Sequence, residues 1–252
     1  MKNVRVVVFA IALGTPGALR ASGTPCALSQ DVVDAAPKTG PIYARIPRSD
    51  MVALLPPPPA PDSATVNKEL QQLHKLQNSS ESKQAALADS REVSVFVYRT
   101  VLGDKFTASA LPLTDALSTQ IRNDSNYWNN QLKNIYQRPR PYRHDSTLSP
   151  SCGTSDAYSY PSGHSMAGYL LAMMLAEIVP EQRGAIFRRA DDYARNRWIC
   201  GAHYPSDTIM AHQIAATLFG VMLANPAFQE KLTAARTETR RHLGLPELPP
   251  DQ

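Results

Sequence analysis

The chain has 252 residues, of which 43% are hydrophobic, 19% are charged and 7% are aromatic. A chain of this length and composition can form a globular domain whose core is large enough to carry a binding cleft, and it is not a disordered chain, a collagen or a coiled coil. The formal net charge is +4 at pH 7.

The N-terminus has the pattern of a secretory signal peptide. Lys2 and Arg5 form a basic start, residues 6–13 are apolar, and small residues follow a break at residues 15–17. A buried N-terminal strand or helix is the alternative, but the order basic, apolar, small is typical of export. We therefore expect residues 1–21 to be removed and the mature chain to be periplasmic or secreted.

Nucleic acid and membranes are not expected partners of the mature chain. Removal of residues 1–21 takes away three basic and no acidic residues, which lowers the net charge from +4 to +1. A nucleic-acid partner needs a basic face, and no long run of Lys and Arg provides one. Residues 166–179 are too short for a membrane span of about eighteen apolar residues, and residues 208–224 contain His212 and Gln213.

Residues 22–62 are predicted to form an extended N-terminal arm. Four consecutive prolines follow Leu54 and Leu55, and proline fixes φ and lacks an amide hydrogen, so this run must be extended. Ser63 is a candidate helix N-cap, because apolar residues recur after it at helical spacing. A helical domain is expected over residues 63–245, followed by a short tail at residues 246–252.

The domain is predicted to be all-α. Residues 93–102 alternate like a strand, but no partner strand is visible, so we interpret them as helix. The amphipathic segment that starts at Thr114 must stop where Pro139 and Pro141 arrive. No internal repeat and no Gly-rich strand–turn–helix unit is present, which argues against an α/β fold. Helices are expected from residue 63 onward and over residues 81–90, 93–102, 114–135, 163–178, 181–198, 206–224 and 226–243.

Side chains that carry chemistry gather in three short clusters. Lys133 precedes Arg140, residues 160–164 read Tyr-Pro-Ser-Gly-His, and Arg197 precedes His203 and Asp207. Taken singly, each cluster has a simpler interpretation: a solvated basic helix end, which would include Arg138, an ordinary helix start, and a surface histidine. Their combination favours chemistry over these simpler interpretations.

The combination fits the transfer of a phosphoryl group, whose transition state spreads negative charge over three oxygens. Lys133, Arg140 and Arg197 can supply fixed cations for those oxygens. Ser162, as a helix N-cap, lets the amide of Gly163 point at an anion from a helix N-terminus. These five residues are the candidate phosphate-binding residues.

The two histidines of the clusters match the two remaining requirements, a nucleophile and a general acid. Asp207 lies four residues after His203, close enough to hold one imidazole nitrogen and leave the other free to attack. We therefore expect His203, oriented by Asp207, to be the nucleophile. His164 is then the general acid, and it later activates water against the phosphohistidine.

The three clusters resemble, in order and spacing, the three-part signature of the type 2 phosphatidic acid phosphatase (PAP2) superfamily. Within it, residues 54–59, 133–142 and 197–203 resemble the bacterial class A non-specific acid phosphatases, and the resemblance spans roughly residues 50–230. The residues that match the signature are Lys133, Arg140 and Pro141; Pro161, Ser162, Gly163 and His164; and Arg197, His203 and Asp207.

The resemblance implies an all-helical fold of the PAP2 and vanadium haloperoxidase type. It also implies a secreted or periplasmic acid phosphatase that hydrolyses phosphomonoesters of broad specificity, releases inorganic phosphate and needs no metal or cofactor. The family's roles for the matching residues agree with those derived above. One departure is Asn196, which stands where the family usually has Ser before Arg197 and can still donate a hydrogen bond. A homo-oligomer and the preferred ester are left open.

Three alternatives compete with this interpretation. Vanadate-dependent haloperoxidases share the oxyanion pocket but are as a rule much longer chains, and a membrane lipid phosphatase needs several spanning helices. A zinc-binding module without catalysis is the third: Cys200 and His203, together with Cys152 and His164, have suitable ligand chemistry. It leaves the candidate cations without a role, and cations beside Zn²⁺ would weaken its binding.

The chain has three cysteines, Cys26, Cys152 and Cys200, and export permits a disulfide. Cys152 lies between the first two clusters and Cys200 lies within the third. Because all three clusters must converge on one phosphate, we expect a Cys152–Cys200 disulfide, with Cys26 unpaired in the arm. Two buried thiols are the alternative.

Overall fold

The computed structural model describes residues 40–79 and 83–248. The expected signal peptide, residues 22–39 of the arm with Cys26, and the last four residues of the tail lie outside this part. Within the described part every regular element is a helix. The all-α prediction is therefore confirmed for these residues.

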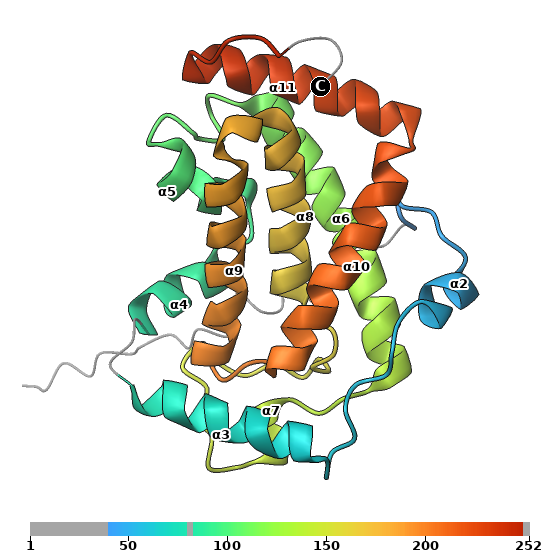
Figure 1. Ribbon diagram of the computed structural model, residues 1–252, viewed down its shortest axis with the longest axis vertical. Helices are drawn as coiled ribbons and strands as arrows, with labels where there is room; N and C mark the ends of the chain where they lie inside the picture. Colours follow the sequence, from blue (N-terminus) through green and yellow to red (C-terminus); the bar gives the residue numbers. More distant parts are fainter. Residues whose placement is uncertain (1–39, 80–82, 249–252) are drawn as a thin grey trace, which may run out of the picture.

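The core of the bundle is formed by α6 (Pro112–Tyr136), α8 (Gly163–Ile178), α9 (Arg183–Ile199) and α10 (Pro205–Leu223), which lie side by side (Figure 1). Successive core helices run in opposite directions, so the C-terminal ends of α6 and α9 meet the N-terminal ends of α8 and α10. Helix α11 (Pro226–Leu243) crosses one end of the bundle, and α3 (Ala64–Asn78) crosses the other.

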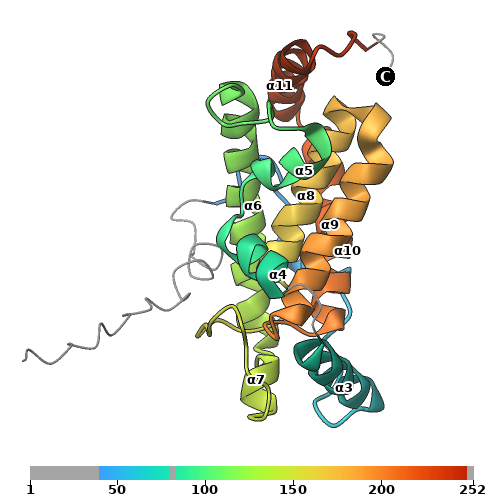
Figure 2. The same ribbon diagram turned by 90° about the vertical axis from the view of Figure 1, so that its left-hand side faces the viewer.

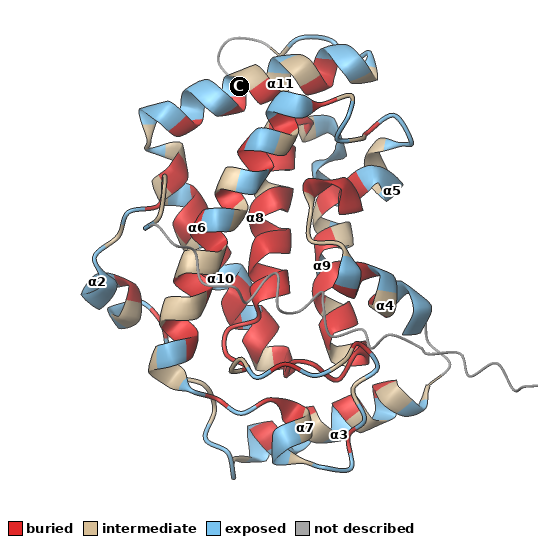
Figure 3. Cartoon of the chain, turned by 180° about the vertical axis from the view of Figure 1, so that it is seen from behind, coloured by how far each residue is buried: buried red, intermediate tan, exposed pale blue. Residues whose placement is uncertain are grey.

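Helix α8 is the centre of the bundle because it is apolar on nearly every side. Fourteen of its 16 residues are buried, and it contacts α6, α9, α10 and α11. In Figure 3 it is almost entirely coloured as buried, whereas α3 and α4 (Lys83–Arg91) show exposed faces. A helix that is hydrophobic all round belongs in a core, and α8 carries its first residues, among them His164, into that core.

The helix boundaries follow local sequence signals. Ser63 caps α3 by accepting a hydrogen bond from the amide of Val66, as the sequence predicts. Helix α6 starts with Pro112 and ends at Tyr136, where Gln137 turns left-handed with φ of 48°. The prolines at 139 and 141 could not have continued it.

The segment that alternates like a strand is helical but short. Residues 95–98 form a 3₁₀ helix, and α5 (Arg99–Leu102) follows directly. All four side chains of the 3₁₀ helix are buried, so its alternating apolar residues reflect burial on several sides rather than a sheet. Seen from the side in Figure 2, α4 and α5 lie in front of the bundle, and both contact α9.

The N-terminal arm is not extended throughout, contrary to expectation. Residues 48–53 form α2, and the buried Met51 packs into the main core cluster. The proline run beyond α2 has no regular structure. The arm is held along α6 by Asp124, which accepts hydrogen bonds from the amides of Tyr43 and Ala44 at 2.8 and 2.7 Å.

No single helix in the described part is long and apolar enough to cross a membrane. Helices α10 and α11 satisfy the criteria of length and composition only when taken together, and they are bent by 96° where they meet.

Candidate active site

The antiparallel bundle brings the three sequence clusters together at the end that α3 covers. Each cluster occupies a helix end or the loop beside it, and every one of its candidate residues is buried. They come from the last turn of α6 (Lys133), the following loop (Arg140), the start of α8 (Ser162, Gly163 and His164), the last turn of α9 (Arg197), the loop before α10 (His203) and the first turn of α10 (Asp207).

The N-terminus of α8 has the N-cap that the sequence predicts. Ser162 is its N-cap, and the Ser162 hydroxyl accepts from the amide of Ser165. Gly163 is the first helical residue, so its amide is one of the first-turn N–H groups that no carbonyl of the same helix satisfies. The amide of Ser162 donates to the carbonyl of Asp207 at 3.1 Å, which joins this helix start to α10.

His203 and Asp207 form a buried pair at the start of α10. The Nδ1 atom of His203 lies 3.3 Å from Oδ2 of Asp207. The same oxygen accepts from the hydroxyl of Ser159 at 2.5 Å and from the amide of Tyr204 at 2.9 Å. These donors fix the carboxylate, and the carboxylate in turn orients the imidazole.

The other side of the His203 ring meets Arg140. Nη1 of Arg140 lies 2.8 Å from Nε2 of His203, and a guanidinium has only donors, so Nε2 must present its lone pair. The hydrogen of the neutral imidazole is therefore on Nδ1, facing Asp207. Arg140 itself is fixed by donating to the carbonyls of Ala157 and Ala202, at 2.9 and 3.1 Å.

The surroundings of His203 are buried and cationic. Burial is the largest cause that holds the pKa of His203 well below its usual value of 6.5, and Arg140, Lys133, Arg197 and His164 lower it further. Neutral imidazole is thus favoured at acidic pH. Asp207 behaves in the opposite way: burial raises the pKa of its carboxyl, while Arg138 and the hydrogen bonds described above oppose that rise.

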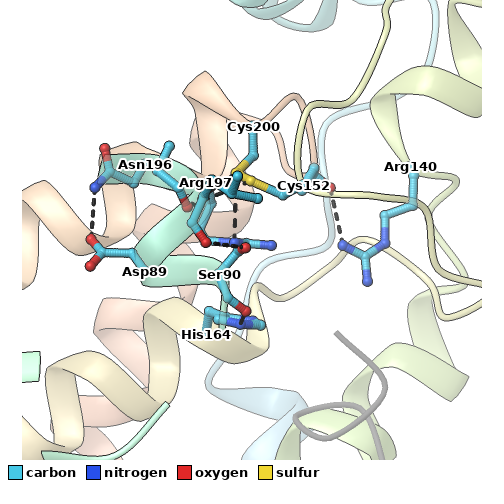
Figure 4. Close-up of a disulfide and its surroundings, with 11 residues drawn as sticks. Asp89, Ser90, Arg140, Cys152, His164, Asn196, Arg197 and Cys200 are labelled. Carbon is cyan, nitrogen blue, oxygen red and sulfur yellow. Dashed lines mark hydrogen bonds between the residues drawn. A yellow bond between two sulfur atoms is a disulfide. The ribbon is translucent and has the colours of Figure 1, made fainter. Parts of the chain in front are cut away.

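His164 lies in the first turn of α8 and points toward α4. Its Nε2 is 3.2 Å from the carbonyl oxygen of Ser90 (Figure 4). A carbonyl can only accept, so Nε2 carries a hydrogen and Nδ1 is the nitrogen that can take up and release a proton. The ring of Tyr193 lies beside that of His164, with 6.2 Å between the ring centroids.

Cys152 and Cys200 form a disulfide, the pair that the sequence predicts. Their Cα atoms are 5.3 Å apart, and Nη1 of Arg197 lies 3.8 Å from the sulfur of Cys200 (Figure 4). The zinc-module alternative loses both of its thiol ligands to this bond. Among the described residues, no group of three or more His, Cys, Asp or Glu side chains is arranged to hold a metal ion.

The turn between α9 and α10 requires Gly201. Its φ is +70°, in the left-handed region that other residues rarely adopt, and a Cβ atom there would also contact the side chain of Gln77. The turn is closed by the amides of Ala202 and His203, which donate to the carbonyl of Arg197 at 3.1 and 3.3 Å. The third cluster therefore folds back on itself, bringing His203 close to Arg197.

Sequence comparison finds relatives over most of the chain. The profile of the PAP2 superfamily matches residues 116–230. The non-specific acid phosphatase of Salmonella typhimurium is 32% identical over 196 residues, which cover 73% of this chain and 78% of that protein. The chain belongs to the PAP2 superfamily.

Other relatives of this PAP2 protein carry similar names. The non-specific acid phosphatase of Providencia stuartii is 31% identical over 201 residues, covering 75% of this chain and 80% of that one. An acid phosphatase of Zymomonas mobilis is 27% identical over 250 residues, covering 94% and 92%. A solved transmembrane PAP2 type phosphatidylglycerolphosphate phosphatase from Bacillus subtilis matches at 18% identity over 67% of this chain and 98% of that chain, with a TM-score of 0.34, too distant to add to the argument.

Sequence reasoning missed several residues of the PAP2 site. Arg138 fits the description of a solvated helix end, yet it is buried and pairs with Asp207 and Glu69. Ser159 lies just outside the second cluster, and its contact with Asp207 has no sequence signature. The one sequence signal for Arg138 is its position two residues before Arg140 and three before Pro141.

Asn196, which replaces the family's usual Ser, makes a defined contact. Its Nδ2 donates to Oδ2 of Asp89 at 2.7 Å, and Asp89 also pairs with Arg189 at 2.6 Å. Asp89 precedes Ser90, whose carbonyl meets His164. Asn196 therefore helps to hold the end of α4 that positions the second histidine.

Proposed function

We propose that this PAP2 protein is an acid phosphatase that hydrolyses phosphomonoesters of broad specificity through a phosphohistidine on His203. The observation that carries the proposal is the fixed state of His203, with Nδ1 facing Asp207 and Nε2 held 2.8 Å from Arg140. Relatedness over most of the chain to proteins named non-specific acid phosphatase supports it.

In the first step, Nε2 of His203 attacks the phosphorus atom and the bond from phosphorus to the ester oxygen breaks. His164 gives the proton on Nδ1 to the departing oxygen, so an alcohol leaves. Lys133, Arg140 and Arg197, with the amide of Gly163, stabilise the charge on the three equatorial oxygens. Asp207 stabilises the positive charge that develops on the His203 ring.

In the second step, water replaces the alcohol. His164, now without its Nδ1 proton, accepts a proton from water as the oxygen attacks phosphorus and the bond from phosphorus to Nε2 breaks. Inorganic phosphate leaves, His203 is neutral again, and His164 is again protonated. The cycle uses the charges of the described residues and needs no redox partner.

Acidic operation follows from the different needs of the two histidines. The general acid must be protonated, whereas the nucleophile must be neutral. The low pKa of His203, caused by burial and by the neighbouring cations, supports a neutral nucleophile at a pH where an ordinary imidazole is charged.

The test is a panel of aryl, alkyl, sugar and nucleotide phosphomonoesters, assayed between pH 4 and pH 9 with and without EDTA. We expect hydrolysis of many members, fastest below neutral pH and unaffected by EDTA. Loss of activity in EDTA that Zn²⁺ or Mg²⁺ restores would overturn the mechanism. Halide oxidation by the vanadate-loaded protein, without ester hydrolysis, would favour the haloperoxidase alternative.

We further propose that the enzyme works in the periplasm or outside the cell. The N-terminal pattern of residues 1–21 supports this, as does a pair of half-cystines, which persists in an oxidising compartment. Cell fractionation and N-terminal sequencing of the mature protein test it. An intact N-terminus on protein recovered from the cytoplasm would contradict it.

A further inference from the structure

Arg138 bridges two buried carboxylates at the edge of the site. Its Nη1 donates to Oδ1 of Asp207 at 2.6 Å, and its Nη2 donates to Oε2 of Glu69 at 3.1 Å. The three side chains are 6%, 0% and 8% exposed, respectively. The guanidinium carbon also lies 3.8 Å from the centre of the Tyr204 ring. Glu69, Arg138, Asp207 and His203 therefore form one continuous buried chain.

Glu69 is itself fixed to the start of α10. Its Oε1 accepts from the amide of Ser206 at 2.6 Å, and its Oε2 is 3.1 Å from the Ser206 hydroxyl. Burying a carboxylate is costly unless it is paired and hydrogen-bonded, and these contacts satisfy that condition. Helix α3, which otherwise covers the end of the bundle, thereby places a negative charge behind the catalytic pair.

The two oxygens of Asp207 have separate tasks. Oδ1 receives Arg138, whereas Oδ2 receives Ser159, the amide of Tyr204 and the His203 ring. Arg138 thus holds the carboxylate from the side opposite to His203. It acts on the nucleophile through Asp207 and not through the substrate.

We infer that Arg138 and Glu69 are positioning residues that control, with opposite signs, how readily the His203–Asp207 pair takes up an extra proton. They thereby set the acid limit of the nucleophile, which is the pH below which His203 can no longer attack. The inference rests on the proposed function, because an acid limit matters only if His203 attacks. The positive charge of Arg138 opposes the extra proton, and the negative charge of Glu69 favours it.

The pair titrates as a unit, because its two members share one hydrogen bond. An extra proton makes His203 an imidazolium, or it resides on Asp207 and leaves the ring hydrogen on Nε2. Either location removes the lone pair that attacks. The acid limit therefore reports proton uptake by the pair, wherever the proton resides.

Other charged groups face the same pair and remain in place in the variants below. Lys133 on α6, Arg140 beside α7 (Pro141–His144), His164 on α8 and Arg197 on α9 all act on His203. Tyr160 and Tyr204 stand beside Asp207 and Arg138, and burial raises the pKa of each phenol, so both stay neutral in the acid range.

The experiment measures the midpoint of proton uptake by His203 without substrate, from the NMR signals of ¹⁵N-labelled imidazole in the full mature chain. The acid limb of kcat/KM for p-nitrophenyl phosphate is recorded in parallel. The variants are Arg138→Gln, Arg138→Lys and the double variant Glu69→Gln/Arg138→Gln. Arg143→Gln is the matched control, because Arg143 lies on the same segment but pairs with the exposed Asp156.

Arg138→Gln should raise the midpoint by about one pH unit, from the loss of one nearby charge at an intermediate dielectric constant. Adding Glu69→Gln should reverse about half of that rise. Arg138→Lys keeps the charge and should stay within a few tenths of a unit of the wild-type protein, as should Arg143→Gln. The acid limb of kcat/KM should move with the midpoint.

An unchanged midpoint in Arg138→Gln, or a further rise in the double variant, would overturn the inference, since a merely structural pair would lower activity at every pH without opposite shifts. If Arg138→Gln does not fold, Glu69→Gln alone must lower the midpoint, and a rise there would overturn the inference. Because the NMR titration needs no substrate, a protein inactive on every ester would contradict the proposed function, and the midpoint shifts would still decide whether Arg138 and Glu69 control proton uptake by the pair.

Discussion

The two histidines of the site, His164 and His203, have the same side chain in two different surroundings. His203 is held on both ring nitrogens by charged side chains, Arg140 and Asp207. His164 meets a backbone carbonyl, that of Ser90, and an aromatic ring, that of Tyr193. The first environment fixes a neutral ring whose Nε2 lone pair faces Arg140, and the second leaves Nδ1 as the nitrogen that can take up and release a proton.

In the proposed mechanism, this contrast separates a nucleophile from an acid without a change of side chain. The charges around His203 come from helix ends and loops that the bundle brings together, so its state depends on tertiary structure. His164 depends on one helix start and on α4, which the Asn196–Asp89 contact holds. Breaking one environment should leave the other largely intact.

The largest expected effect is at His203. His203→Ala should lower kcat by about 10⁴-fold or more, because the attacking atom is gone, while phosphate still binds to the remaining cations. Asp207→Asn should cost less, since it disturbs orientation and charge without removing Nε2. Steady-state kinetics and phosphate inhibition measure both variants, and a His203→Ala enzyme with wild-type kcat would contradict the assignment.

Removal of a phosphate-binding cation should rank second. Arg140→Ala or Arg197→Ala should lower kcat/KM by about 10²- to 10³-fold, because each charge stabilises the transition state directly. Inhibition by phosphate should weaken in parallel. Arg236→Ala, remote from the site on α11, is the control and should retain activity. Equal kinetics for the site variants and this control would refute the binding role.

The His164 environment is tested by the leaving group. His164→Ala should lower kcat/KM, which reports the first step, by about 10³-fold for an alkyl phosphate but by only about tenfold for p-nitrophenyl phosphate, because p-nitrophenolate departs without protonation. The ratio of the two losses is the measurement. Equal losses on both esters would mean that His164 does not act as the acid.

The disulfide should have the smallest effect on chemistry and a clear effect on stability. The Cys152→Ser/Cys200→Ser variant opens a loop with a sequence separation of 48, which should cost about 4 kcal/mol in the chain-entropy picture. Chemical denaturation of the variant and the wild-type protein measures the difference, with Cys26→Ser as the control. A variant as stable as the wild type, or free alkylation of both thiols in the unfolded, non-reduced chain, would remove the bond from the account.

The sequence predicts the site better than it predicts what supports it. The helix ends and the eight candidate residues carry local signals: proline at 139, an N-cap at Ser162, and spacing of four from His203 to Asp207. The residues that support the site carry no such local signal, because they lie on segments that are distant in the sequence. Glu69 lies on a helix whose pattern is that of an amphipathic surface helix, and Ser90 contributes a backbone carbonyl, which any residue possesses.

The N-terminal arm also contains a feature that the sequence does not predict, the short helix α2. The proline run of the arm has no regular structure, as the lack of amide donors leads one to expect, but the short α2 depends on Met51 reaching the core. Propensity within six residues is too weak to predict such a helix, because tertiary burial supplies most of its stability. The features that the sequence does not predict therefore depend on contacts between residues that are far apart in the chain.

The central claim, attack by Nε2 of His203, is tested most directly by trapping the intermediate. The His164→Ala enzyme, mixed with p-nitrophenyl phosphate, should release one equivalent of p-nitrophenolate in a burst, since the good leaving group departs while water is no longer activated. Alkaline quenching, digestion and mass spectrometry should then place the phosphoryl group on His203. A phosphoryl group on another residue, or turnover without a burst and with no phosphorylated peptide, would contradict the account.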